Sequence, residues 1–141
     1  MKRVLIAGYF DPLHEGHLDH IVKAAGLGDR LIIVTHTDEC IKRVKGMRFT
    51  TEGFRQFVLE AILGKLGVSG KVCIISSEDV SNVIRKMQPH IFAKGGDRIP
   101  GNMPQAEIEA CEEVGCQIMY GIGDLLNSSS RIKKTLEATW K

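Results

Sequence analysis

The sequence predicts an α/β fold in which a doubly wound, parallel sheet of five strands carries helices on both faces. Five short apolar segments run without alternation, which is typical of strands buried on both faces of a parallel sheet. Segments with helical periodicity lie between them, and this order indicates right-handed crossover connections. The 141 residues are about one domain's length, so we expect residues 1–141 to form a single domain.

Each predicted strand is a run of three or four apolar residues. The runs are Val4–Ala7, Leu31–Val34, Val72–Ile75, Ile91–Ala93 and Ile118–Tyr120. In doubly wound sheets, ligands bind beyond the carboxyl ends of the strands, where the strand order reverses. We therefore expect the functional residues in the loops Gly8–Gly16, Thr35–Thr50, Lys94–Asn102 and Gly121–Ser130.

Four helices between the strands are predicted by apolar side chains that recur at helical spacing. Their apolar stripes lie within Leu18–Ala25, Phe54–Ile62, Val80–Met87 and Ile108–Val114. A fifth helix is expected to begin within residues 127–130 and to turn Ile132 and Leu136 inward.

Capping signals indicate where these helices begin and end. Thr50 or Thr51 is expected to cap the second helix. A serine and an aspartate at capping-box spacing, residues 76 and 79, are expected to open the third. Pro104 is expected in the first turn of the fourth helix, and Gly115 just past its end.

Charge and composition exclude several classes of function. Nineteen Lys and Arg against 17 Asp and Glu leave a net charge of +2, which argues against an extended basic surface for nucleic acid. The four cysteines form no C-x-x-C pair, so neither zinc nor redox spacing is met. No segment resembles a signal peptide or approaches the ~20 apolar residues of a membrane span. We therefore expect a cytoplasmic protein with reduced thiols and neither a membrane nor a nucleic-acid partner.

The first loop carries the most specific motif, GYFDPLHEGH at residues 8–17. It is neither the dinucleotide-binding glycine motif nor a P-loop. Instead, His14 and His17 flank Gly16 at the start of a helix, where two imidazoles three residues apart can face the same way. Free N–H groups and the positive end of the helix dipole point at the same space. This arrangement favours an anion whose charge grows during reaction, such as an α-phosphorus under attack.

A metal site is the alternative interpretation of these histidines. His14, His17 and His20 are close in sequence, but no nearby cysteine and no H-E-x-x-H pattern completes a zinc ligand set. We therefore expect no protein-held metal here. A lone histidine at a helix start is usually a cap or a surface residue, but the whole motif is more specific than any lone histidine.

Several segments resemble one family. Residues 8–11 (GYFD) with residues 14–17 (HEGH) resemble the signature of the cytidylyltransferase-like nucleotidyltransferases, the His-x-Gly-His superfamily. Residues 44–48 (VKGMR), followed by Glu52 and Arg55, resemble its lysine-containing loop and arginine helix. Residues 93–97 (AKGGD) resemble the heptose 1-phosphate adenylyltransferase domain of lipopolysaccharide core biosynthesis, and residues 128–132 (SSSRI) the helix start that closes the nucleotide site. The similarity covers nearly the whole chain and implies a Rossmann-like fold.

The resemblance implies transfer of a nucleotidyl group from a nucleoside triphosphate to a phosphorylated small molecule, with release of pyrophosphate. It implies that His14, His17 and Lys45 are catalytic, with Lys45 in a loop that folds over the site. The implied nucleotide-binding residues are Tyr9, Phe10, Asp11, Gly16, Lys94, Gly95, Gly96, Asp97, Ser128, Ser129 and Ser130. Arg55 and Arg131 are candidates for contact with the acceptor or a phosphate, although Arg55 can equally cover its helix with its stem.

The resemblance also implies Mg²⁺ as a cofactor. Mg²⁺ is expected to arrive with the triphosphate, because it binds substrate phosphates with only one or two carboxylates. Asp11 and Asp38 are the candidates for those carboxylates. No protein nucleophile is expected, since the acceptor phosphate attacks directly and catalysis is then positioning plus electrostatic stabilisation. Relatives are often dimers, and Phe49 or Trp140 is a candidate for a homodimer interface.

The substrates are open among several alternatives. The AKGGD stretch favours AMP transfer from ATP to a phosphorylated sugar or polyol such as heptose 1-phosphate. CTP with glycerol 3-phosphate, or FAD synthesis from FMN, are alternatives; the glycerol-phosphate branch carries RTEGISTT where this chain has GDLLN at residues 123–127. A nucleotide-binding module without catalysis is an alternative of another class, and it would not need both histidines.

Overall fold

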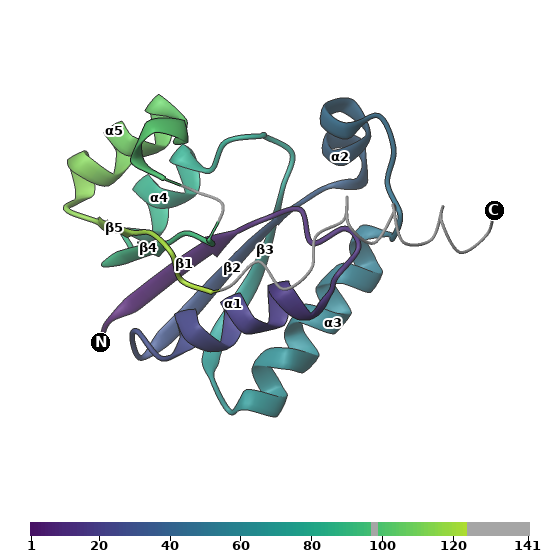
Figure 1. The fold of residues 1–141 in the computed structure, drawn as a ribbon, viewed down its shortest axis with the longest axis horizontal. Coiled ribbons are helices and arrows are strands. Elements are labelled where there is room, and N and C mark those ends of the chain that lie inside the picture. The colour runs from purple at the N-terminus through teal and green to yellow at the C-terminus, as the bar shows by residue number, and fades with distance from the viewer. Residues whose placement is uncertain (97–98, 124–141) are drawn as a thin grey trace.

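The computed structural model describes residues 1–96 and 99–123 (Figure 1). Its sheet has five parallel strands in the order β3-β2-β1-β4-β5. The strands are β1 (Arg3–Ala7), β2 (Arg30–His36), β3 (Ser69–Ile75), β4 (Ile91–Ala93) and β5 (Gln117–Met119). In the sheet, β2 and β3 lie on one side of β1, and β4 and β5 lie on its other side. The predicted doubly wound α/β fold is therefore confirmed, and its switch point lies where β1 and β4 end.

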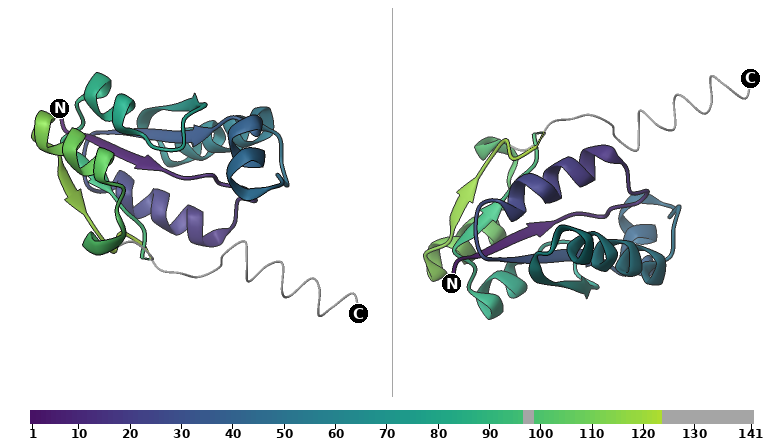
Figure 2. Two further views of the ribbon diagram at one scale, coloured as in Figure 1. Left: turned by 90° about the horizontal axis from the view of Figure 1, so that it is seen from above. Right: turned by 90° about the horizontal axis from the view of Figure 1, so that it is seen from below.

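Helices cover both faces of this sheet (Figure 2). The helices of the described residues are α1 (Glu15–Ala25), α2 (Asp38–Lys45), α3 (Glu52–Leu66), α4 (Ser81–Met87), α5 (Gln105–Val114) and a 3-10 turn, η1 (Pro100–Asn102). Helices α1 and α3 contribute to the core on one face, and α4 and α5 to the core on the other. The helices that the sequence predicts between the strands are thus present.

Alternate residues of the same strands supply the two cores. Val4 and Ile6 of β1 share a core with Ile21 of α1 and Leu59 of α3. Leu5, between them in sequence, belongs to the other core with Ile84 of α4. Because both faces are buried, the strand sequences are apolar without alternation, as expected for a parallel sheet covered on both faces.

Helix α2 is the main difference from expectation. A loop is expected over residues 35–50, but residues 38–45 form a helix. The Thr37 side chain caps it by accepting the Cys40 N–H at 3.1 Å, and Gly46 ends it with φ of 83°. Only Cys40 and Ile41 of this helix are buried. Its apolar stripe is therefore too short to be recognised by periodicity.

The ends of α3 and α5 lie close to their expected positions. Thr51, one of the two expected caps, accepts the Phe54 N–H at 3.3 Å. Pro104 is the N-cap residue of α5 rather than part of its first turn, and Gly115 ends this helix with φ of 71°. A positive φ suits glycine because it has no Cβ to clash.

The capping box expected for α4 is wrong. Val80 is the N-cap residue, and it makes no side-chain cap. Asp79 acts instead within the turn, where its carboxylate accepts the Ser81 N–H at 2.9 Å. Ser76 takes no part, because it directly follows β3 and its carbonyl accepts from Arg43 at 2.9 Å.

The helix expected to begin within residues 127–130 lies outside the described residues. Within residues 1–96 and 99–123, no helix is long and apolar enough to span a membrane. All four cysteines are free thiols, and Cys40, Cys111 and Cys116 are buried.

Candidate active site

The loop after β1 is held firmly at the switch point. The Gly8 N–H donates to the Val34 carbonyl of β2 at 3.0 Å, and the Thr35 hydroxyl donates to the Tyr9 carbonyl at 3.1 Å. Phe10 has φ of 52° and its side chain is buried. A Cβ at Gly8 would lie 3.3 Å from the Phe10 ring. This close approach explains the glycine at the end of β1.

The two histidines of the motif cap helix α1. The Gly16 N–H donates to Nδ1 of His14 at 3.1 Å, and the His14 N–H donates to Nδ1 of His17 at 3.3 Å. Their rings stack, with centroids 3.8 Å apart and an interplanar angle of 22°. Phe10 supports the pair from the side, with its ring edge-on to His17 at 5.0 Å. The two imidazoles therefore form one rigid unit at the amino end of a helix.

These hydrogen bonds set the tautomer of both rings when they are neutral. A nitrogen that accepts a backbone N–H carries no hydrogen, so in the neutral ring Nε2 is the donor. Burial lowers the pKa of His14 from its usual value. Burial, followed by the neighbouring histidines and Lys45, lowers the pKa of His17 to about 3. Near neutral pH the site thus offers two neutral Nε2–H donors.

An anion fits this arrangement. Two N–H donors and the amino end of α1 all favour negative charge, and they are in place before a ligand binds. Such preorganised donors stabilise charge that develops on a transferring phosphoryl group. The structure therefore brings His14, Gly16 and His17 together as the sequence predicts.

Lys45 is placed differently from expectation. It is the last residue of α2, not part of a loop. Its Nζ lies 4.7 Å from the centroid of the Tyr9 ring, a distance typical of a cation–π contact. Its charge contributes to the lowered pKa of His17. The helix thus brings a cation to the side of the paired histidines, and its catalytic role stays a prediction.

Asp11 anchors a second loop. Its carboxylate accepts the Phe49 N–H at 2.8 Å, and the Thr50 N–H and hydroxyl at 2.7 Å each. The side chain is buried, with 3% of its residue surface exposed. The structure therefore uses Asp11 to tie residues 49–50 to the first loop. From the sequence, Thr50 is expected only as a helix cap. The hydrogen bonds between Thr50 and Asp11 are not predicted, because the two residues are 39 positions apart in the chain.

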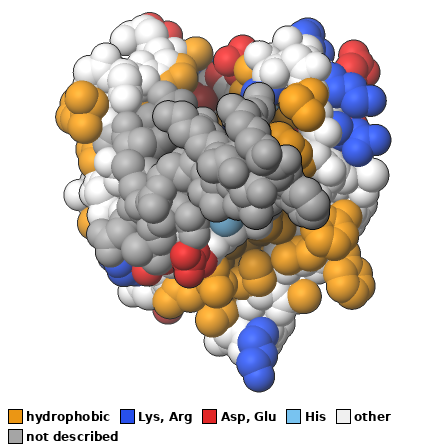
Figure 3. Space-filling view, turned by 45° about the vertical axis from the view of Figure 1, so that its right-hand side comes forward, with side chains coloured by type: hydrophobic (Ala, Val, Ile, Leu, Met, Phe, Trp, Pro, Cys, Tyr) orange, Lys and Arg blue, Asp and Glu red, His pale blue; other side chains and the backbone are white. Residues whose placement is uncertain are grey.

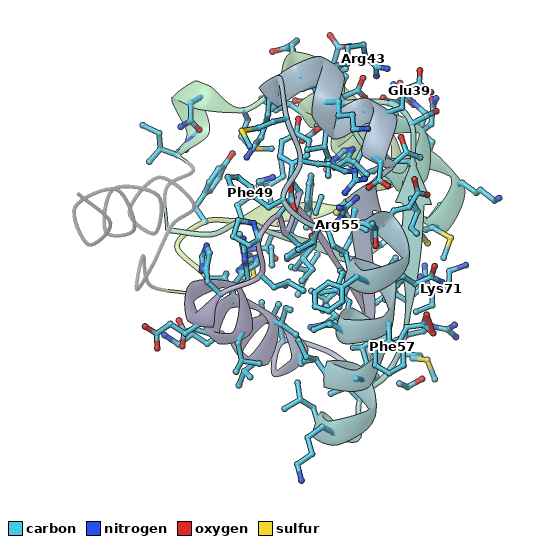
Figure 4. All side chains as sticks on the ribbon, turned by 90° about the vertical axis from the view of Figure 1, so that its right-hand side faces the viewer. Glu39, Arg43, Phe49, Arg55, Phe57 and Lys71 are labelled. Atoms are coloured by element: carbon cyan, nitrogen blue, oxygen red, sulfur yellow. The ribbon has the colours of Figure 1, made fainter. Side chains whose placement is uncertain are left out.

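Arg55 lies in the interior of the protein. It is expected either to reach the acceptor or a phosphate or to cover its helix with its stem, and its side chain is 0% exposed. Figure 4 shows it in the interior, between the bodies of α2 and α3. Its guanidinium donates to the carbonyls of Thr50 and His36 and to the carboxylate of Asp38. Arg55 is thus engaged by groups of the protein itself, and its contact with an acceptor or a phosphate stays a prediction.

The residues after β4 lie at the other side of the switch point. The Lys94 N–H donates to the Met119 carbonyl at 2.7 Å, and its carbonyl accepts from Ile122 at 2.9 Å. Its side chain is buried, with Nζ 4.4 Å from the centroid of the Phe92 ring. Gly95 and Gly96 follow at the carboxyl end of β4, where a nucleotide is expected. Asp97, Ser128, Ser129, Ser130 and Arg131 lie outside the described residues.

The acidic side chains near the site are engaged by the protein. Asp11 accepts from residues 49 and 50, and Asp38 pairs with Arg55 at 3.0 Å and Arg48 at 3.6 Å. In the part of the chain that the structure describes, no group of three or more His, Cys, Asp or Glu is placed to hold a metal. Binding of Mg²⁺ together with the triphosphate stays a prediction.

Two stacked imidazoles and a nearby cation thus lie at the switch point of a doubly wound sheet. A family model described as cytidylyltransferase-like matches residues 5–135, and the chain belongs to this family.

Relatives from two Vibrio species are similar to this chain. The chain is 37% identical over 99 residues to the bifunctional protein HldE of Vibrio cholerae, and 40% identical over 100 residues to that of Vibrio atlanticus. Each match covers 70% of this chain but only 20% of the relative, so the chain matches about a fifth of their length.

Two solved structures share the fold. A lipopolysaccharide core biosynthesis protein from Thermoplasma volcanium has a TM-score of 0.65 at 23% identity, and the match covers 90% of this chain and 99% of that one. A protein of unknown function from Archaeoglobus fulgidus has a TM-score of 0.64 at 24% identity, with 94% and 96% covered. At this identity the likeness shows the fold alone.

Proposed function

We propose that this protein transfers AMP from ATP to the phosphate of a phosphorylated sugar or polyol, such as heptose 1-phosphate, and releases pyrophosphate. The observation that carries the proposal is the stacked pair of neutral imidazole donors at the amino end of α1. The family supports nucleotidyl transfer. The choice of a sugar phosphate is supported by the AKGGD stretch and by the relatives.

In the proposed reaction, a phosphate oxygen of the acceptor attacks the α-phosphorus. The new P–O bond forms as the bond to the bridging oxygen of pyrophosphate breaks, and that oxygen keeps the electron pair. His14 and His17 donate Nε2–H to the phosphate oxygens on which charge develops. Lys45 adds a positive charge at the same place. Bound Mg²⁺ would neutralise part of the triphosphate charge.

A panel of substrates tests the proposal. ATP and CTP are each paired with heptose 1-phosphate, glycerol 3-phosphate and FMN, and pyrophosphate release is measured. ATP with heptose 1-phosphate is expected to be the fastest pair. Release with CTP and glycerol 3-phosphate, or with FMN, would assign a different member of the same class. No pyrophosphate release from any pair would reject the enzymatic proposal and favour a nucleotide-binding module.

A further inference from the structure

Arg55 joins four separate parts of the chain around one buried charge. It extends from the first turn of α3 and reaches the end of β2 through the His36 carbonyl at 3.0 Å. It reaches the start of α2 through Asp38 at 3.0 Å, and the 48–50 loop through the Thr50 carbonyl. Its Nη1 also lies 3.9 Å from Asp11 of the first loop.

Arginine suits this set, because its planar guanidinium presents N–H donors in fixed directions. Nη1 and Nη2 of Arg55 donate to two carbonyls and a carboxylate, whereas its buried Nε has no hydrogen-bond partner in the described part of the chain. Arg55 lies between two carboxylates, and both Asp11 and Arg55 are almost fully buried. Such a buried charge needs its partners, because charge removed from water is costly unless paired.

The start of α2 is fixed from two directions. Asp38 pairs with Arg55, and its backbone N–H donates to Glu52 at 3.1 Å. Both Arg55 and Glu52 lie in the first turn of α3. At the other end of α2 stands Lys45, seven residues or about 10 Å along a helix. A helix transmits a displacement of its start to its end.

We propose that Arg55 is a positioning residue that holds α2 so that Lys45 stands beside the paired histidines. The inference rests on the proposed function, because it assigns Lys45 to the phosphates of the donor. In this role Arg55 does not act on the substrate itself. It acts through Asp38 and α2, while Asp11 ties the same arginine to the loop that ends in His14.

A double-mutant cycle tests this role. The binding of inorganic tripolyphosphate is measured by calorimetry for the wild type, Arg55→Met, Lys45→Met and the double variant. Arg55→Met is expected to weaken binding about tenfold in the wild-type background and less than twofold when Lys45 is already replaced, because coupled residues are not additive. Additive effects, or no effect of Lys45→Met alone, would overturn the proposal.

A second variant covers the case in which Arg55→Met does not fold. Asp38→Asn removes the charge that links Arg55 to α2 but leaves Arg55 and Asp11 in place. The same non-additivity with Lys45→Met is expected, and additivity would again overturn the proposal. Arg85→Met is the matched control, since it breaks an exposed ion pair with Glu113 at 2.8 Å and should leave tripolyphosphate binding unchanged.

The binding measurement separates this proposal from the proposed function. If the cycle is non-additive but no substrate pair releases pyrophosphate, positioning by Arg55 stands and the enzymatic proposal fails. If pyrophosphate is released but the cycle is additive, the enzymatic proposal stands and positioning by Arg55 fails.

Discussion

The two imidazoles of the site use their two nitrogens differently. Nδ1 of each ring accepts a backbone N–H, at 3.1 Å for His14 and 3.3 Å for His17. This bond caps the helix and at the same time leaves Nε2–H as a donor. A protonated ring could not accept at Nδ1, so the cap favours the neutral form. Structure and proposed chemistry therefore depend on the same tautomer.

Replacement of either histidine tests its role as a donor. His14→Ala or His17→Ala is expected to lower kcat by about 10²–10³-fold, the usual cost of one donor to a developing charge. Nucleotide affinity should weaken much less. Turnover is measured by pyrophosphate release and affinity by calorimetry. His90→Ala is the control, because His90 also accepts a backbone N–H at Nδ1, from Arg3 at 2.9 Å, but lies outside the site. Unchanged turnover in both site variants would contradict the assignment.

The lowered pKa of His17 predicts how stability depends on pH. The pKa of His17 is lowered to about 3 by burial, whereas an unfolded histidine titrates near 6.5. Between these values the unfolded chain binds a proton that the folded chain does not. The free energy of unfolding therefore falls as pH falls below 6.5, by about 1 kcal/mol from this residue between pH 7 and pH 5.5.

Urea unfolding at pH 7 and pH 5.5 measures this effect. His17→Asn keeps an acceptor near the Nδ1 position but does not titrate, so it should lose less stability on acidification than the wild type. Part of the dependence should persist in His17→Asn, since burial also lowers the pKa of His14 and His36. A loss in His17→Asn equal to that of the wild type would contradict the prediction.

At the scale of elements, the periodicity of the sequence predicts those strands and helices that have a long apolar face. The strands and the helices α1, α3, α4 and α5 all show such a face and lie close to their expected positions. Helix α2 lacks one, because only Cys40 and Ile41 are buried. Its capping signals, Thr37 and Gly46, are present in the sequence and would have been the better guide.

Two glycines differ in whether a side chain could be added without a clash. A Cβ at Gly70 of β3 would lie 2.1 Å from the Leu31 carbonyl oxygen of β2, whereas one at Gly64 of α3 would meet nothing within 4 Å. Gly70→Ala must therefore separate β3 from β2, and it is expected to cost about 2 kcal/mol or more. Gly64→Ala should instead stabilise by about 0.5–1 kcal/mol, because alanine is the better helix former.

Urea unfolding measures the change in the free energy of unfolding for the two alanine variants. Each variant adds the same methyl group. Gly64→Ala serves as the control for Gly70→Ala. Loss of stability in both, or in neither, would mean that the approach of β3 to β2 does not set the cost.

At the scale of the whole molecule, the topology is predictable but the interior of the site is not. The loops after β1 and β4 meet because strand order reverses between them, which follows from the alternation of elements. The cluster of Asp11, Asp38 and Arg55 depends on three segments converging, and no local pattern encodes it. Periodicity treats a charged residue such as Arg55 as surface, yet it is fully buried.

The homodimer stays a prediction at this scale. Figure 3 shows hydrophobic side chains gathered on one face of the molecule. In the described residues, Phe57 is 75% exposed and Phe54 53% on α3, and Phe49 is 49% exposed. Trp140 lies outside the described residues. These exposed phenylalanines make α3 a second candidate surface beside Phe49.

The position of the site between the two halves of the sheet predicts a strong effect of ligand on stability. A triphosphate at the switch point would contact both the β1 loop and the β4 loop, so it can bind only while the sheet is intact. At 100 times its Kd, a ligand that binds only the folded state adds about 2.7 kcal/mol. For a chain of this size that corresponds to a rise in Tm of roughly 8 °C.

Thermal unfolding with different ligands shows which part of the nucleotide supplies this energy. At equal concentration, ATP and tripolyphosphate should both raise Tm, and adenosine should raise it least, because the two imidazoles are proposed to donate to phosphate oxygens. The double variant His14→Ala, His17→Ala should lose most of the shift with tripolyphosphate. A rise with adenosine equal to that with ATP would instead place the binding energy in the base and ribose, and so in the residues after β4 rather than in the histidine pair.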